Sequence, residues 1–365
     1  MEANWSFDTH RLASINESST VWGMKNQIAI IAVLVSIGPA YAGDETTDLR
    51  TSAALAKIGH SAHGSAFDEG PRQRPVRLEG IGQVHFPITT TVPEVQEWFD
   101  QGMALMHSFW FYEAERAFRW CLKLDPDCTM AYWGLAQTHL NWSSAFINVD
   151  RGYDFLKEAV RRKDRVSRHE RLYIEAWAYA FAPLTPDVPG DSGQTSMTDL
   201  IATYNTKHKK LADKLEMIVL EFPDDVEAMA LHGLYSIGTS GRYANDLVLR
   251  QVLATAPEHP GAHHYLIHNW DGPEGAQVLK SCAVYGRIAP TIGHANHMPG
   301  HIYSGIGMWH EAAIWMDSAT RVEKRHMHTQ LTFPFNNSNY AHNRNYLSYI
   351  QEQLGMRTAA LDGAR

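Results

Sequence analysis

The sequence predicts an all-α protein, a right-handed solenoid of stacked helical hairpins, and three observations lead to this fold class. From about residue 93, apolar residues recur at intervals of three and four, which is the spacing of one face of an α-helix. Strand-like runs are short, as in residues 84–90. Prolines recur at a nearly constant distance, since Pro223, Pro257 and Pro290 stand 34 and 33 residues apart. A period of that length is typical of hairpin arrays.

The first 42 residues form an N-terminal extension (1–23) followed by a predicted signal peptide (24–42). Lys25 gives a positive start, residues 28–37 form a short apolar run, and Ala40-Tyr41-Ala42 is a small-x-small cleavage signal. The apolar run is too short to span a bilayer comfortably, although an uncleaved anchor is the alternative. We therefore expect cleavage after Ala42, a periplasmic or secreted chain, and no stable membrane anchor.

Residues 43–80 are polar and aperiodic, and we interpret them as a linker that leads into a helical-repeat domain over residues 81–365. Pro93 stands where the first helix of this domain would begin. A segment rich in proline, glycine and aspartate, residues 182–196, interrupts the array and is predicted to be a surface loop.

The first hairpin has the small/aromatic/proline spacing of a tetratricopeptide repeat. The residues that carry it are Gly102, Ala114, Phe118 and Pro126. The small residues let the two helices of a hairpin approach closely, and the proline begins the turn into the next repeat. Two later segments look like copies of the turn inside such a hairpin, GMWHEA (307–312) and LGMRTAA (354–360).

Taken together, four segments resemble a secreted bacterial tetratricopeptide-repeat family of longer chains, over roughly residues 80–365. They are FDQGM…YWGLA (99–136), HFPITT (85–90), HPGAHHYLIH (259–268) and HANHMPGHIY (294–303). The resemblance implies a helical-repeat fold and a histidine-rich centre, but no particular reaction. This chain stops at LDGAR, part-way through a repeat, and a solenoid needs a polar capping helix. We therefore expect a C-terminal truncation.

Composition excludes several classes of protein. The net charge of −8 and the lack of a basic run argue against a nucleic-acid partner. The three cysteines, Cys121, Cys128 and Cys282, allow at most one disulfide and lack the paired CxxC knuckles of a zinc ribbon. Histidine is unusually frequent, with 20 residues, so its placement in the repeats becomes the main question.

The register of the repeats places six histidines together. Two of them lie seven residues after Pro257 and Pro290, and two more lie eleven residues after these prolines. Another pair stands thirteen residues before the turn glycines Gly307 and Gly355. Equivalent positions on the first helices of successive hairpins line one concave face. The predicted set is His264, His268, His294, His297, His301 and His342.

Six imidazoles in one patch predict one or two transition-metal ions, with copper as first choice and zinc as second. Imidazole is a common ligand of both metals, and the i, i+4 spacing lets two rings reach one ion. A set that is poor in carboxylates disfavours magnesium and calcium. Two ions with three imidazoles each have the ligand set of a coupled dicopper, oxygen-handling centre. The alternative is a hydrogen-bonded polar face that binds an organic ligand.

Four further residues are candidates for contacts behind the ligands. His263 points a quarter-turn away from His264. Asp271 follows the predicted helix and would be a seventh ligand, orient a ligand or cap the helix end. Tyr303 flanks the cluster and would pack between helices or hold substrate, and Asn343 would orient a ring. His85 lies outside the repeat register, where it could fold over the face as an extra ligand.

These observations predict a metal-dependent enzyme, an oxidoreductase with a zinc hydrolase as runner-up. Its small-molecule or peptide substrate would lie in the concave groove, and the repeat surface would accept a protein partner. No nucleophile elbow, HExxH motif, phosphate-binding loop or dinucleotide fingerprint occurs in the sequence. A non-enzymatic metal carrier or docking scaffold is the second class of function.

Overall fold

The computed structural model describes residues 70–71, 73–142, 148–183 and 197–363, and every regular element among them is helical. This confirms the all-α prediction. The described residues belong to one compact unit, Glu69–Arg365. The signal peptide and most of the expected linker and surface loop lie outside the described ranges. Within those ranges, no helix combines the length and apolar character needed to cross a membrane.

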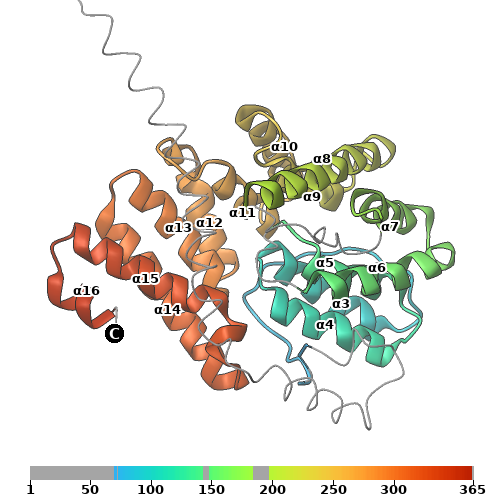
Figure 1. Cartoon of the computed structure of the whole chain (residues 1–365), viewed down its shortest axis with the longest axis horizontal. Helices are drawn as coiled ribbons and strands as arrows, with labels where there is room; N and C mark the ends of the chain where they lie inside the picture. The colour runs from blue at the N-terminus through green and yellow to red at the C-terminus, as the bar shows by residue number, and fades with distance from the viewer. Residues whose placement is uncertain (1–69, 72, 143–147, 184–196, 364–365) are drawn as a thin grey trace, which may run out of the picture. The chain divides into compact units, whose positions relative to one another are not determined.

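Fourteen α-helices, α3 to α16, are described, with short 3-10 turns between some of them (Figure 1). In the first half of the chain they are α3 (Pro93–His107), α4 (Phe111–Leu124), α5 (Thr129–His139), α6 (Val149–Arg162), α7 (Arg168–Ala180), α8 (Met197–Glu221) and α9 (Val226–Ser236). In the second half they are α10 (Arg242–Thr255), α11 (Pro260–Asn269), α12 (Leu279–Ile288), α13 (Gly293–Gly305), α14 (Trp309–Gln330), α15 (Ser338–Gln353) and α16 (Arg357–Gly363).

Each helix packs against the next one in the chain, so consecutive helices form hairpins. Helices two places apart also touch, because α9 contacts α11, α11 contacts α13, and α13 contacts α15. The helices α9, α11, α13 and α15 therefore stand side by side in one layer. In addition, α11 contacts α3, although the two helices lie far apart in sequence.

Close approach within the first hairpins depends on small residues around one aromatic ring. Phe118 on α4 is fully buried, and its ring lies against Gly102 of α3 and Gly134 of α5. A Cβ at Gly134 would lie 2.7 Å from the ring, and one at Gly102 would overlap it. The two glycines thus leave the space that Phe118 fills, which ties three helices together.

The segment before α3 runs along the helices rather than away from them. The backbone N–H of Gly82 donates to the carbonyl of Ile288 at 3.0 Å, and that of Thr291 donates to Gly80 at 3.2 Å. Gly82 also lies against Pro260, the first residue of α11. This segment therefore joins α3 to the beginnings of α11 and α13. All three cysteines are free and buried.

Candidate metal centre

The starts of α11 and α13 are fixed soon after the repeat prolines, and this sets the register of their histidines. His259 caps α11, because its Nδ1 accepts the N–H of Ala262 at 3.0 Å, and Pro260 occupies the first turn. At α13, Asn296 donates to the carbonyls of Pro290 and Ile292 at 3.2 and 2.8 Å. Similar offsets from Pro257 and Pro290 therefore become similar positions on neighbouring helices.

The structure brings all six predicted histidines together and divides them into two groups of three. In each group, one ring nitrogen from every residue lies within 4.8 Å of the other two. Site A consists of His264 and His268 from α11 with His294 from α13. Site B consists of His297 and His301 from α13 with His342 from α15. Each group could therefore hold one metal ion through three imidazoles.

Sites A and B adjoin each other on α13. The rings of His294 and His297, one turn apart on this helix, have centroids 4.4 Å apart. Within site A the His264 and His294 rings are 4.6 Å apart, and within site B the His297 and His301 rings are 4.9 Å apart. The six imidazoles form a continuous series, so two bound ions would be close neighbours.

Burial keeps these imidazoles in the neutral form that binds metals. Desolvation lowers the pKa of His268 to about 3 and that of His301 to about 4. It lowers the pKa of His342 to about 3, and neighbouring imidazoles add to the effect at His268 and His342. The pKa values of the other three fall well below the ordinary value, with burial as the main cause. Protons therefore compete weakly for the ligand nitrogens at neutral pH.

The hydrogen bonds of site A leave ring nitrogens available for an ion. His264 donates from Nδ1 to the backbone carbonyl of His107 at 2.5 Å, which leaves its Nε2 unprotonated. That Nε2 lies 2.8 Å from the Nε2 of His294. The Nε2 of His268 is buried and makes no hydrogen bond to any described residue. A buried nitrogen without a partner is costly, and an ion bound by His268 would satisfy it.

In site B a chain of side chains orients one ligand. His297 donates from Nδ1 to Oδ1 of Asn343 at 2.7 Å, and Asn343 donates from Nδ2 to Glu323 at 2.9 Å. The Nε2 of His297 is therefore free for an ion. His301 and His342 bring their Nε2 atoms within 3.1 Å of each other. A ligand held through its second nitrogen is the usual arrangement at a metal site.

The four residues expected behind the ligands lie in different places. Asn343 contacts His297 as described above. Asp271 lies just beyond the end of α11, with its carboxylate 3.9 Å from Nδ1 of His301, and burial raises its pKa to about 6. His263 bonds the carbonyl of Pro257 at 2.9 Å, and Tyr303 packs on an apolar cluster that includes Met316.

Aromatic side chains that the sequence did not single out cover both sites. The ring centroid of Phe109 lies 4.4 Å from that of His264 and 5.5 Å from those of His268 and His294. Trp142 lies 5.2 Å from His268. At site B, the ring of Tyr346 lies 4.4 Å from that of His301. Phenylalanine, tryptophan and tyrosine are not part of the histidine spacing, so the sequence pattern did not predict these rings.

His107, Glu227 and His259 form a third group of potential metal ligands. Unlike the nitrogens of site A, the ring nitrogens of this group are all hydrogen-bonded within the protein. Because His259 accepts at Nδ1, its proton lies on Nε2 and goes to Glu227, 3.1 Å away. His107 contacts Glu227 at 2.7 Å through Nε2 and the hydroxyl of Tyr265 at 2.7 Å through Nδ1. Every ring nitrogen of the group thus has a partner. An ion would have to break this network.

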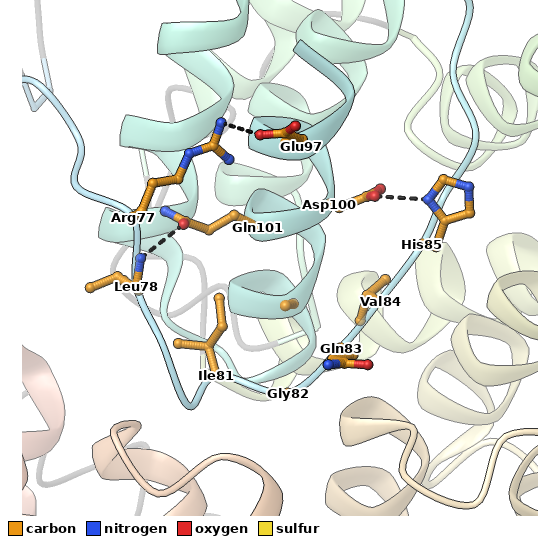
Figure 2. Close-up of a pocket in the computed structure, with 11 residues that line it drawn as sticks. Arg77, Leu78, Ile81, Gly82, Gln83, Val84, His85, Glu97, Asp100 and Gln101 are labelled. Atoms are coloured by element: carbon orange, nitrogen blue, oxygen red, sulfur yellow. Dashed lines mark hydrogen bonds and ion pairs between the residues drawn. The ribbon is translucent and has the colours of Figure 1, made fainter. Parts of the chain in front are cut away.

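His85 belongs to neither site A nor site B. It lines an open groove of about 530 Å³ between residues 77–85 and α3, where its Nδ1 contacts Asp100 at 2.8 Å (Figure 2). Arg77 and Glu97 form an ion pair at 2.8 Å in the same groove. No histidine of site A or site B lines it. The groove has no group of converging metal ligands.

The comparisons with known proteins give no family for this chain. No protein-family model matches it, and no curated protein is significantly similar to it. The geometry of the two histidine groups is therefore what indicates a function for this chain.

Proposed function

We propose that this chain is a secreted metalloprotein with a tetratricopeptide-like solenoid and a dinuclear copper centre, and that it acts as an oxidoreductase. The observation that carries the proposal is the pair of adjoining triads, each with three imidazole donors and no carboxylate among them. Copper held by imidazoles supplies redox chemistry toward dioxygen. The residues of both sites fit such ions, because they are neutral, converging and in part without other partners.

Three features support the repeat architecture. Helices α9, α11, α13 and α15 stand side by side, as the first helices of stacked hairpins do. Phe118 fills the space left by Gly102 and Gly134, in agreement with the small/aromatic spacing of the first repeat. The GMWHEA and LGMRTAA segments both form left-handed turns between helices, at Gly307 and Gly355.

The protein's own groups hold the ligands and exclude water. The carbonyl of His107 orients His264, and the Asn343–Glu323 pair orients His297. The rings of Phe109 and Trp142 cover site A. In the proposed reaction, a small-molecule or peptide substrate would lie beside these rings. A protein partner would bind the outer repeat surface.

Metal analysis of the purified chain tests the proposal directly. We expect two copper ions per chain, and one in His264→Ala and in His297→Ala, because each variant removes a ligand of one triad. His263→Ala is the matched control, since this neighbour of His264 bonds the carbonyl of Pro257 and belongs to neither triad. A wild-type chain that takes up neither copper nor zinc would refute the proposal, as would full occupancy in both ligand variants.

Spectroscopy separates the copper enzyme from its alternatives. Two coupled Cu(II) ions give no ordinary EPR signal, whereas isolated Cu(II) does. A zinc hydrolase would be colourless and EPR-silent in every state, and its three-imidazole site would keep one position for water. A metal carrier would exchange its ion readily with a chelator. Slow exchange together with silent, coupled copper would support the oxidoreductase.

Secretion is part of the proposal and has its own test. The segment that carries it, residues 24–42, lies outside the described residues. Expression of the full chain in a bacterium with a periplasm should give a product that begins at Gly43. Mass spectrometry of the periplasmic fraction measures this directly. An uncleaved chain in the membrane fraction would favour the anchor instead.

A further inference from the structure

Four of the helices end in the same kind of turn, and only two of these turns hold glycine. After α3, α13, α14 and α15, the chain passes through a single left-handed residue: Phe109 (φ 54°), Gly307 (φ 82°), Leu331 (φ 52°) and Gly355 (φ 72°). In each turn, the next N–H donates to a carbonyl five residues back. These bonds are Trp110 to Leu105 (2.9 Å), Met308 to Tyr303 (2.8 Å), Thr332 to Met327 (3.2 Å) and Met356 to Gln351 (2.8 Å). This bond belongs to the Schellman motif, whose left-handed position usually holds glycine.

Phenylalanine is unfavourable at the left-handed backbone position that Phe109 occupies. A residue with a Cβ is strained in the left-handed region, and a bulky aromatic there is a rare exception. Two of the other turns hold glycine, and the third holds Leu331, whose side chain is exposed. Phe109 differs from Leu331 because its ring is partly buried against other residues.

The ring of Phe109 lies over the three imidazoles of site A. It is 4.4 Å from the ring of His264 and stacks at 30° on that of His268. On another side it stacks at 26° on Trp142, 5.7 Å away. Phe109 and Trp142 are only partly buried. The two rings thus lie against one side of site A.

A small pocket adjoins the Phe109 ring. Phe109, Trp142 and Tyr265 line it together with apolar side chains, among them Met106 and Leu234. Its free volume is about 10 Å³, which is room for about one water molecule. None of its lining side chains is acidic or basic.

One polar group in this space lacks a partner. Gln137 of α5 lines the pocket and is 1% exposed, and its Nε2 makes no hydrogen bond to any described residue. It stands eleven residues after Pro126, the same offset that His268 has from Pro257. A buried amide donor without an acceptor is costly, so an oxygen on a bound molecule would stabilise it.

We propose that a small neutral phenol binds beside site A. Its ring takes the place of the Phe109 ring and its oxygen enters the Gln137 pocket, so Phe109 acts as a gate that must move aside for the phenol to bind. The binding itself needs no metal, and its catalytic meaning rests on the proposed function. The ring of Phe109 shows that a six-membered aromatic ring fits between Trp142 and the imidazoles of site A. Gln137 supplies a donor for the phenol oxygen, and the uncharged walls disfavour carboxylates.

The experiment measures binding of 4-fluorophenol and fluorobenzene to the full, metal-stripped chain by fluorine NMR. Phe109→Gly replaces the ring with the residue found at two of the other turns, so the backbone is relieved while the subsite opens. We expect this variant to bind 4-fluorophenol at least about 10-fold more tightly than the wild type. Adding Gln137→Leu to this variant should lower its affinity for 4-fluorophenol by about 2- to 12-fold. Its affinity for fluorobenzene, which has no hydroxyl, should stay unchanged.

Phe155→Ala is the control for a cavity of similar size, since Phe155 is fully buried on α6. It should show no preference for the phenol over fluorobenzene. The inference is overturned if Phe109→Gly binds neither compound, if it binds both equally, or if Gln137→Leu changes neither affinity. Because the chain is metal-free, phenol binding with no copper uptake would refute only the proposed function. Copper uptake without phenol binding would refute only the gate.

Discussion

At the scale of single residues, the site depends on which nitrogen of each imidazole is protonated. A backbone carbonyl fixes this choice at His264, and an amide fixes it at His297. The sequence predicted Asn343 as an orienting residue because it neighbours His342. Glu323, its partner, lies on α14, the second helix of its hairpin. Equal offsets in the sequence relate only the first helices of successive hairpins, so the sequence carries no signal for Glu323 on a second helix.

The Asn343 contact leads to a test of ligand orientation. Asn343→Leu should weaken metal binding at site B by about 10- to 100-fold, because His297 loses the acceptor that holds its tautomer. Site A should keep its ion. Glu323→Gln is the matched control, since an amide oxygen can still accept from Nδ2 of Asn343. Isothermal titration with copper measures both, and equal affinities in the two variants would contradict the orienting role.

The lowered pKa values of the histidines predict the pH dependence of the metal-free chain. An unfolded histidine takes up a proton near pH 6.5, whereas burial lowers the folded pKa to about 3 at His268 and His342 and to about 4 at His301. Below pH 6.5 the unfolded chain therefore binds more protons. The stability present above that pH should fall as the pH drops from about 6.5 towards 3–4.

Thermal melts of the metal-free protein between pH 7 and pH 4 measure this loss. His268→Gln should make the melting temperature depend less on pH, because it removes one group whose pKa differs between the two states. His310→Gln is a suitable control, since His310 lies at the start of α14 and in neither triad. A melting temperature that stays constant over this range would show that the imidazoles are not held neutral by the fold.

At the scale of helices, the sequence predicted neighbouring positions well and contacts between distant repeats poorly. Equal offsets from Pro257 and Pro290 predicted the common face of α11 and α13, because a repeat places equal offsets at equal heights. The position of Phe109 over site A could not be predicted in this way. It depends on the contact between α3 and α11, which are separated by several hairpins, and a local period carries no information on it.

The packing of Phe118 against two glycines gives a prediction for the hairpins. Gly134→Ala should destabilise the chain by about 1–3 kcal/mol, because its Cβ would lie 2.7 Å from the Phe118 ring. Gly241→Ala has open space around it and an ordinary backbone angle, so it should cost only about 0.5–1 kcal/mol through the poorer N-cap of α10. Urea unfolding compares the two variants. Equal effects would mean that Phe118 is not tightly fitted.

At the scale of the whole molecule, site A lies where distant parts of the chain meet. The carbonyl of His107, at the end of α3, holds His264 of α11 across 157 positions of sequence. His107 also reaches Glu227 of α9 through its ring, and Gly82 joins the segment before α3 to the end of α12. Helices from both halves of the described chain thus fix the imidazoles of site A.

Metal removal should consequently loosen one region of the molecule more than the rest. Six ligands from α11, α13 and α15 would bind the ions, so these helices gain the most from occupancy. With free metal at 100 times the dissociation constant, each ion adds about 2.7 kcal/mol to stability. Chelation should therefore lower the melting temperature and speed amide exchange in α11, α13 and α15, while α6 and α7 change little. Exchange that rises equally in α6 would show that the ions do not bridge these three helices, even if the chain binds copper.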